Sequence, residues 1–197
     1  MSDSWEVNFM KNKNQTKKLV LSALLTAVVI IFQLIGGIPV GPCNLAIALI
    51  PIVIGAVICS PLVGAWLGFV CGATILISGQ ATLFVGFSPV GAVATTLVKG
   101  VLCGLTSGLV YKALKNKNST VAAVAAAITC PIVNTGVFFI GCLIFFVNGL
   151  AEMAGTSGID SKFIYFMFTG LAGVNFLLEF FTNLILSPII VRLIKNK

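Results

Sequence analysis

Long apolar segments alternate with short polar ones along the whole chain. A helix of about 20 apolar residues is long enough to cross a bilayer. The apolar run from Leu45 to Ile77 would reach about 50 Å as one helix, which exceeds a single crossing, and Ser60-Pro61 divides it. Six membrane-spanning helices are therefore expected, at Leu19–Ile35, Leu45–Ile58, Leu62–Ile77, Val90–Ala113, Val121–Val147 and Phe163–Ile194.

The polar segments between these spans are expected to be loops. Gly36-Gly37-Ile38-Pro39 is a turn signal after the first span, and the Ser78–Pro89 and Asn148–Lys162 segments follow later ones. The second and third spans are short, so we expect them to be tilted or partly sunk in the bundle. Pro131 should kink the fifth span.

Three clusters that flank the apolar segments contain ten of the twelve basic residues. Cytoplasmic loops of membrane proteins carry an excess of Lys and Arg. Six crossings put both termini on one side, and because both are basic this side is expected to be the cytoplasm. Residues 1–18 are then a cytoplasmic tail, and residues 19–197 form one all-α bundle of six transmembrane helices. The clusters are Lys11, Lys13, Lys17 and Lys18; Lys112, Lys115 and Lys117; and Arg192, Lys195 and Lys197.

The composition excludes several classes of protein. With 58% hydrophobic and 9% charged residues, the chain cannot cover a soluble core, for which about 25% charge is typical. The net charge is +7, and the basic residues that produce it lie beside apolar spans. The expected partner is therefore the anionic leaflet of a lipid bilayer and not nucleic acid. The six cysteines are expected to pack as small buried hydrophobes without disulfides.

Motifs for catalysis are missing from the sequence. It contains no His and no C-x-x-C, so neither a metal site nor a Ser-His triad is expected. It also lacks G-x-x-x-x-G-K-[ST], the phosphate-binding loop of proteins that hydrolyse nucleotides. We therefore expect a protein that is not an enzyme and that has no cofactor.

Two charged residues inside predicted spans are the best candidates for a binding site. Lys99 lies about 13 Å from the outer end of the fourth span, too deep to reach the interface easily. Glu179 lies in the sixth span, in a polar row with Asn175, Thr182 and Asn183 on one helix face. Such charges persist in a membrane only with a partner or a polar cavity. Lys99 and Glu179 could pair with each other, or one of them could contact a ligand.

Other polar residues have two possible roles. Asn134 and Thr135 follow Pro131 by about one turn, where they could satisfy the backbone carbonyl that proline frees or contact a ligand. Asn44, Gln80, Thr82 and Ser88 lie in or beside the first two outer loops, where they could close over a ligand or form ordinary turns. The candidate ligand-binding residues are therefore Asn44, Gln80, Ser88, Lys99, Asn134, Thr135, Asn175 and Glu179.

Small residues recur at every fourth position in three spans. Such stripes let helix backbones approach closely in lipid. For the glycine stripes, packing within the chain is the favoured interpretation. The sets are Ala23 and Ala27; Gly64, Gly68 and Gly72; and Gly100, Gly104 and Gly108.

The order of several short stretches resembles a known family. They are Ser22–Ala27, Ile50–Ala56, Ser60–Ala65, Phe87–Pro89, Asn134-Thr135, and Asn175, Glu179 and Pro188. Together, from about Lys17 to the end of the chain, they are similar to the substrate-binding S component of energy-coupling-factor (ECF) vitamin transporters. The Ile50–Ala56 run and a basic residue in the fourth span look most like the pantothenate group.

The resemblance implies a mechanism and partners. S components of this family capture a vitamin from outside the cell and dock onto a transmembrane T component through an A-x-x-x-A motif, which Ala23 and Ala27 match. Two cytoplasmic ATPases drive the complex, and the S component is thought to topple in the membrane. The resemblance thus implies a multi-pass protein of the bacterial plasma membrane, in which Lys99 would suit a carboxylate ligand.

Three other functions are compatible with the sequence. The ligand could be riboflavin, folate or a related vitamin. The chain could be a self-sufficient secondary transporter or channel, in which Glu179 could serve proton coupling. It could also be a structural membrane subunit whose polar row only joins helices.

Overall fold

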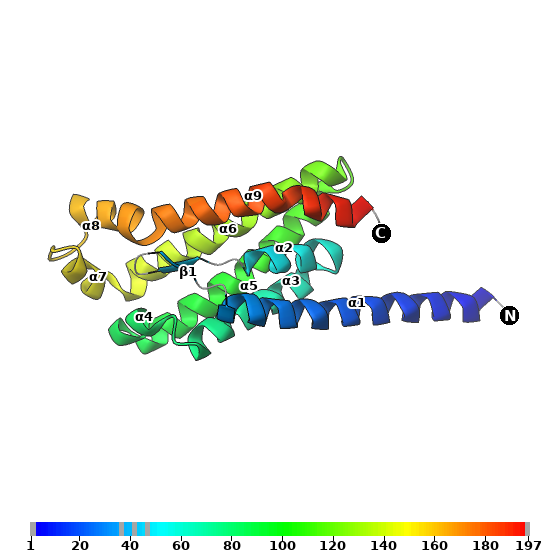
Figure 1. The fold of residues 1–197 in the computed structure, drawn as a ribbon, viewed down its shortest axis with the longest axis horizontal. Coiled ribbons are helices and arrows are strands. Elements are labelled where there is room, and N and C mark those ends of the chain that lie inside the picture. The colour runs from blue at the N-terminus through cyan, green and yellow to red at the C-terminus, as the bar shows by residue number, and fades with distance from the viewer. Residues whose placement is uncertain (1–2, 36–37, 41–42, 46–47, 196–197) are drawn as a thin grey trace.

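The computed structural model describes residues 3–35, 38–40, 43–45 and 48–195. Six helices lie side by side in an elongated bundle: α1 (Asp3–Ile35), α2 (Leu49–Ile58), α3 (Pro61–Ile77), α5 (Pro89–Leu114), α6 (Ser119–Phe145) and α9 (Val174–Lys195) (Figure 1). The start of α1 and the end of α9 lie at the same end of the bundle. Three short helices lie at the opposite end, which we call the outer end: α4 (Thr82–Phe87), α7 (Val147–Met153) and α8 (Ser161–Phe166) (Figure 1).

Length and hydropathy confirm a helical membrane protein. Within the described residues, four segments are long and apolar enough to cross a membrane: Gln15–Ile35, Pro89–Leu114, Ser119–Phe145 and Ser161–Arg192. The other two long elements, α2 and α3, are shorter apolar helices of 10 and 17 residues. The sequence predicted both as short membrane crossings, tilted or partly sunk in the bundle, and that they cross the membrane stays a prediction.

Ser-Pro pairs start two of the helices, directly before the positions where the sequence predicted spans to begin. Ser60 caps α3, because its Oγ accepts a hydrogen bond of 3.2 Å from the backbone N–H of Val63. Ser88 caps α5 in the same way through the N–H of Gly91, also at 3.2 Å. In both cases proline occupies the first helical position, where its missing N–H is no loss.

The expected element boundaries were wrong in two places. Leu45 was assigned to the second span, but it pairs with Ile38 in a hairpin of β1 (Ile38–Val40) and β2 (Cys43–Leu45), and the helix begins only at Leu49. The sixth span was expected to be one regular helix, but a π-helical segment, η1 (Met167–Gly173), separates α8 from α9. Gly173 lies at the end of η1, where an added Cβ would overlap the carbonyl oxygen of Phe168.

Two segments that were expected to be loops contain helices. The Ser78–Pro89 segment contains α4, and the Asn148–Lys162 segment lies partly in α7. Both helices bury apolar side chains, Phe84 from α4 and Leu150 from α7, in a shared outer cluster. Burial of these side chains supplies the stabilisation that such short helices lack in isolation.

Glycines bring α3 and α5 into backbone contact. An added Cβ at Gly68 would overlap the carbonyl oxygen of Gly100, and one at Gly104 would overlap that of Gly64. At Gly72 an added Cβ would lie 2.8 Å from the carbonyl oxygen of Thr96. These contacts confirm that the glycine stripes pack within the chain.

The buried side chains form two clusters along the bundle. One is mainly aliphatic and joins α1, α2, α3, α5, α6 and α9, with Val29, Ile52 and Leu67 among its fully buried members. The other lies toward the outer end and is rich in phenylalanine, including Phe146 and Phe163. Five cysteines are buried free thiols, as expected: Cys59, Cys71, Cys103, Cys130 and Cys142.

Candidate functional site

A buried carboxylate and a buried amide meet in the interior of the bundle. Asn134 of α6 donates a hydrogen bond of 3.0 Å from Nδ2 to Oε2 of Glu179 on α9. The two side chains are only 8% and 2% exposed, so neither points toward lipid. Asn183, one turn after Glu179, donates from its own Nδ2 to the Glu179 backbone carbonyl at 2.9 Å. The Asn134 amide therefore bonds the Glu179 carboxyl group, a contact that neither of the two roles considered from the sequence describes.

Lys99 lies against an aromatic ring. Its Nζ is 5.3 Å from the ring centroid of Phe138, and the side chain is half-buried. A cation over an aromatic face gains about 0.5–2 kcal/mol. Placing a lysine at the centre of a membrane helix costs about 2.5–3.5 kcal/mol on insertion scales. The ring alone does not offset this cost, so Lys99 needs a further favourable interaction.

Lys99 and Glu179 contact residues on the same face of α6. Phe138 follows Asn134 by four residues, so the ring under Lys99 and the amide bound to Glu179 are one turn apart on one face. The two charges therefore border a common part of the interior.

Two buried polar atoms near this region are available for hydrogen bonding. Thr95 Oγ1 and Asn183 Oδ1 have no hydrogen-bond partner within the described part of the chain. Thr95 lies one turn from Lys99 on α5, and Asn183 lies one turn from Glu179 on α9. Buried polar atoms in proteins are nearly always paired. Each atom is therefore an unsatisfied hydrogen-bonding group one turn from a charged residue.

Two residues predicted to bind the ligand make hydrogen bonds within the chain. Gln80 accepts a hydrogen bond of 2.6 Å at Oε1 from Gln33 Nε2, and donates from its Nε2 to the Gln33 backbone carbonyl at 2.9 Å. Ser88 is the N-cap of α5. Capping thus accounts for the Ser88 side chain, and a long-range contact with α1 accounts for the Gln80 side chain. Gln33 was not singled out from the sequence, although a glutamine so close to the end of an apolar span was a usable signal.

The remaining predicted residues lie on three different elements. Thr135 is half-buried on α6, next to Asn134. Asn44 lies in β2, opposite Pro39, and Asn175 lies in the first turn of α9. The side chains of Asn44 and Asn175 are outside the described part of the structure. In that part, no group of three or more Cys, Asp or Glu side chains is arranged to hold a metal ion.

Comparison with known protein families decides what kind of protein carries this arrangement. The sequence model of the family described as "ECF transporter, substrate-specific component" matches residues 17–191. The chain belongs to this family. Neither the curated proteins nor the solved structures provide a match to it. This S component is therefore a membrane-embedded binding subunit of a transporter, and its family functions with a T component and ATPases to take up small-molecule substrates.

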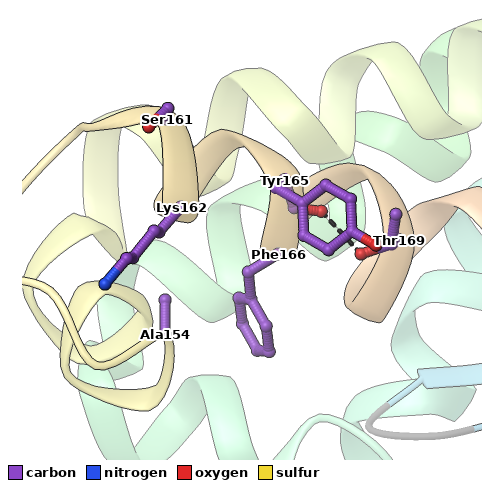
Figure 2. Close-up of a pocket in the computed structure, with 6 residues that line it drawn as sticks. All are labelled: Ala154, Ser161, Lys162, Tyr165, Phe166 and Thr169. Carbon is purple, nitrogen blue, oxygen red and sulfur yellow. Dashed lines mark hydrogen bonds between the residues drawn. The ribbon is translucent and has the colours of Figure 1, made fainter.

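A pocket of about 370 Å³ lies at the outer end of the S component. Figure 2 shows it between the end of α7 and the helix that continues from α8 into η1. Its lining includes none of the residues predicted to bind the substrate, and Lys162 is its one charged member. The lining residues are Ala154, Ser161, Lys162, Tyr165, Phe166 and Thr169.

The alanines of the A-x-x-x-A motif lie on the surface of the S component. Ala23 and Ala27 are both exposed on α1, whereas Leu25 and Val29 of the same helix are buried. The helix therefore packs against the bundle with its other face. The small side chains of the motif allow another helix to approach the backbone of α1 closely.

Proposed function

We propose that this S component captures pantothenate from the outer side of a bacterial plasma membrane for ATP-driven uptake. The observation that carries the proposal is the position of the Lys99 ammonium over Phe138, one turn along α6 from the Asn134–Glu179 hydrogen bond. This arrangement offers a cation, amide groups and an aromatic surface in the interior of an otherwise apolar bundle. Small-molecule sites typically combine an apolar lining with a few such polar groups.

The chemistry of pantothenate is complementary to these groups. The vitamin has a carboxylate at one end, hydroxyl groups at the other end and an amide between them. In our proposal Lys99 binds the carboxylate, which supplies the further interaction that its place in the membrane requires. Thr95 Oγ1 and Asn183 Oδ1 are buried polar atoms that can bond the hydroxyl and amide groups. Asn44, Thr135 and Asn175 are proposed to complete the site.

Six membrane crossings are part of the proposal, with α2 and α3 as the short second and third crossings. The start of α1 and the end of α9 lie at one end of the bundle, as an even number of crossings requires (Figure 1). The basic clusters near Lys17, Lys112 and Arg192 support our proposal that this end faces the cytoplasm. The outer end then carries α4, α7 and α8.

The partner surface is proposed to be the exposed face of α1 around Ala23 and Ala27. A transmembrane helix of the T component would pack there, because small side chains permit close backbone approach. The two ATPases act through the T component from the cytoplasm. This division of labour agrees with a sequence that has no phosphate-binding loop of its own.

Mass spectrometry of the purified protein tests the substrate directly. We expect pantothenate to be released on denaturation, and titration calorimetry of the ligand-free protein in lipid nanodiscs to show one site. Riboflavin and folate serve as competing ligands. If the protein binds riboflavin or folate and does not bind pantothenate, the vitamin that it binds is the substrate in place of pantothenate. Pantothenate transport into liposomes that contain only this chain would instead indicate a self-sufficient transporter.

A further inference from the structure

A reciprocal pair of hydrogen bonds joins the outer end of α1 to the turn before α4. Gln33 Nε2 donates to Gln80 Oε1, and Gln80 Nε2 donates to the backbone carbonyl of Gln33. Cys71 Sγ donates to Gln33 Oε1 at 3.4 Å, so both ends of the Gln33 amide are bonded. Gln33 is only 3% exposed. The carbonyls of a last helical turn lack partners within their own helix, and Gln80 satisfies one of them for α1.

Gln80 lies in the turn that leads into α4. This turn contains Gly79, whose φ of +75° is in the left-handed region that glycine tolerates. The backbone N–H of Thr82 bonds the Gly79 carbonyl at 3.1 Å, and that of Val85 bonds the Ala81 carbonyl at 2.9 Å. Because the turn runs directly into the helix, fixing Gln80 also fixes the start of α4.

From α4 a chain of aromatic contacts leads to Lys99. The Phe84 ring meets the Phe138 ring edge to face, with centroids 5.3 Å apart and planes at 90°. The ring centroid of Phe84 is also 5.2 Å from that of Phe146, which is fully buried. Phe138 in turn lies beneath the Lys99 ammonium. Edge-to-face rings have a preferred geometry, so a displaced Phe84 would displace Phe138 as well.

We propose that Gln33 and Gln80 are positioning residues for the ligand-binding lysine. They hold α4 so that Phe84 and Phe138 keep the Lys99 ammonium in place, and neither glutamine touches the ligand. The helix that carries the proposed partner surface is thereby coupled to the binding site. This inference rests on the proposed function in one respect, which is that Lys99 binds the ligand. The contacts from Gln33 and Gln80 to Lys99 do not depend on that function.

The first test needs no ligand. In lipid nanodiscs, Gln33→Leu and Gln80→Leu should raise hydrogen–deuterium exchange about threefold or more in residues 82–87 and 134–141. Gln15→Leu is the matched control, because Gln15 is an exposed glutamine on the same helix, and it should leave both segments unchanged. Exchange that rises only in residues 30–35 and 78–81 would show a purely local role and overturn the proposal.

The second test uses pantothenate as the probe. Its Kd should rise about tenfold in either single variant and no further in the double variant, because both substitutions remove the same pair. In a Phe84→Leu background, Gln33→Leu should have no additional effect on Kd. Additive effects, or a Kd equal to that of the Gln15→Leu control, would contradict the coupling. If the unmodified protein binds no pantothenate, the substrate assignment fails, and the exchange experiment still decides this inference.

Discussion

The Asn134 side chain donates its hydrogen bond to Glu179 across the interface between α6 and α9, about one turn beyond Pro131. The amide thus supports a buried carboxylate on another helix. A carboxylate in an apolar interior is tolerated only when it is paired or hydrogen-bonded. The Asn134–Glu179 contact is therefore a structural requirement of the bundle as well as part of the proposed site.

Replacing Asn134 should destabilise the protein. Asn134→Leu removes a donor from the buried Glu179 carboxylate, and we expect a loss of about 1–3 kcal/mol in the free energy of unfolding. Thermal unfolding in detergent measures it as a lower Tm. Thr135→Val is the control, since Thr135 is the next residue on α6 and is half-buried. An equal loss in both variants would show that the hydrogen bond itself contributes little.

Replacing Lys99 should weaken ligand binding and spare the fold. Lys99→Met keeps the aliphatic stem and removes the charge that we propose binds the pantothenate carboxylate. A charge-assisted hydrogen bond is worth about 1.5–3 kcal/mol, so the Kd should rise about tenfold to a hundredfold. The Tm should not fall, because the membrane no longer has to hold a charge. Titration calorimetry checks the affinity.

The control is Lys162→Met, at the exposed outer end. This variant should bind pantothenate like the unmodified protein, and a similar loss of affinity would contradict the assignment of Lys99.

Adding a methyl group between α3 and α5 should be costly. Gly68→Ala would push a Cβ into the carbonyl oxygen of Gly100, and the helices would have to separate. Overpacking of this kind costs about 1–3 kcal/mol or more. Gly136→Ala is the matched control, because an added Cβ there meets nothing within 4 Å. Thermal unfolding should therefore show a lower Tm for the first variant, and an unchanged or higher Tm for the second.

Bulky residues on the exposed face of α1 should separate binding from transport. Ala23→Trp and Ala27→Trp should leave the pantothenate Kd unchanged and block ATP-driven uptake by the assembled complex, because the T component could no longer approach closely. Ala113→Trp, at an exposed position on α5, should not affect uptake. Loss of ligand binding in the isolated Ala23 variant would assign this surface to packing within the chain.

The local signals in the sequence were reliable where one residue type decides the structure. Ser60-Pro61 and Ser88-Pro89 begin helices because serine caps and proline fits only the first turn. The four-residue spacing of the glycines predicted close packing within the chain, and the contact of Gly68 with Gly100 confirms it. Polar residues in an apolar helix likewise predicted that Glu179 faces the interior.

The long-range contacts could not be predicted, because they depend on tertiary packing. Nothing in the sequence pairs Asn134 with Glu179, which lies 45 residues later, or Gln33 with Gln80. The sequence also did not indicate that the Gln80 amide is bonded to α1. The hairpin that contains Leu45 and the π-helical turn in the last span were missed, since apolar runs are equally compatible with a regular helix.

The backbone contact between α3 and α5 also limits how this protein can move. Where carbonyl groups touch α-carbons directly, no side chains are available to change rotamer and let one helix slide past the other. The two helices are therefore expected to move together as one rigid pair. Any opening that admits or releases a molecule is therefore expected in the elements around these two helices.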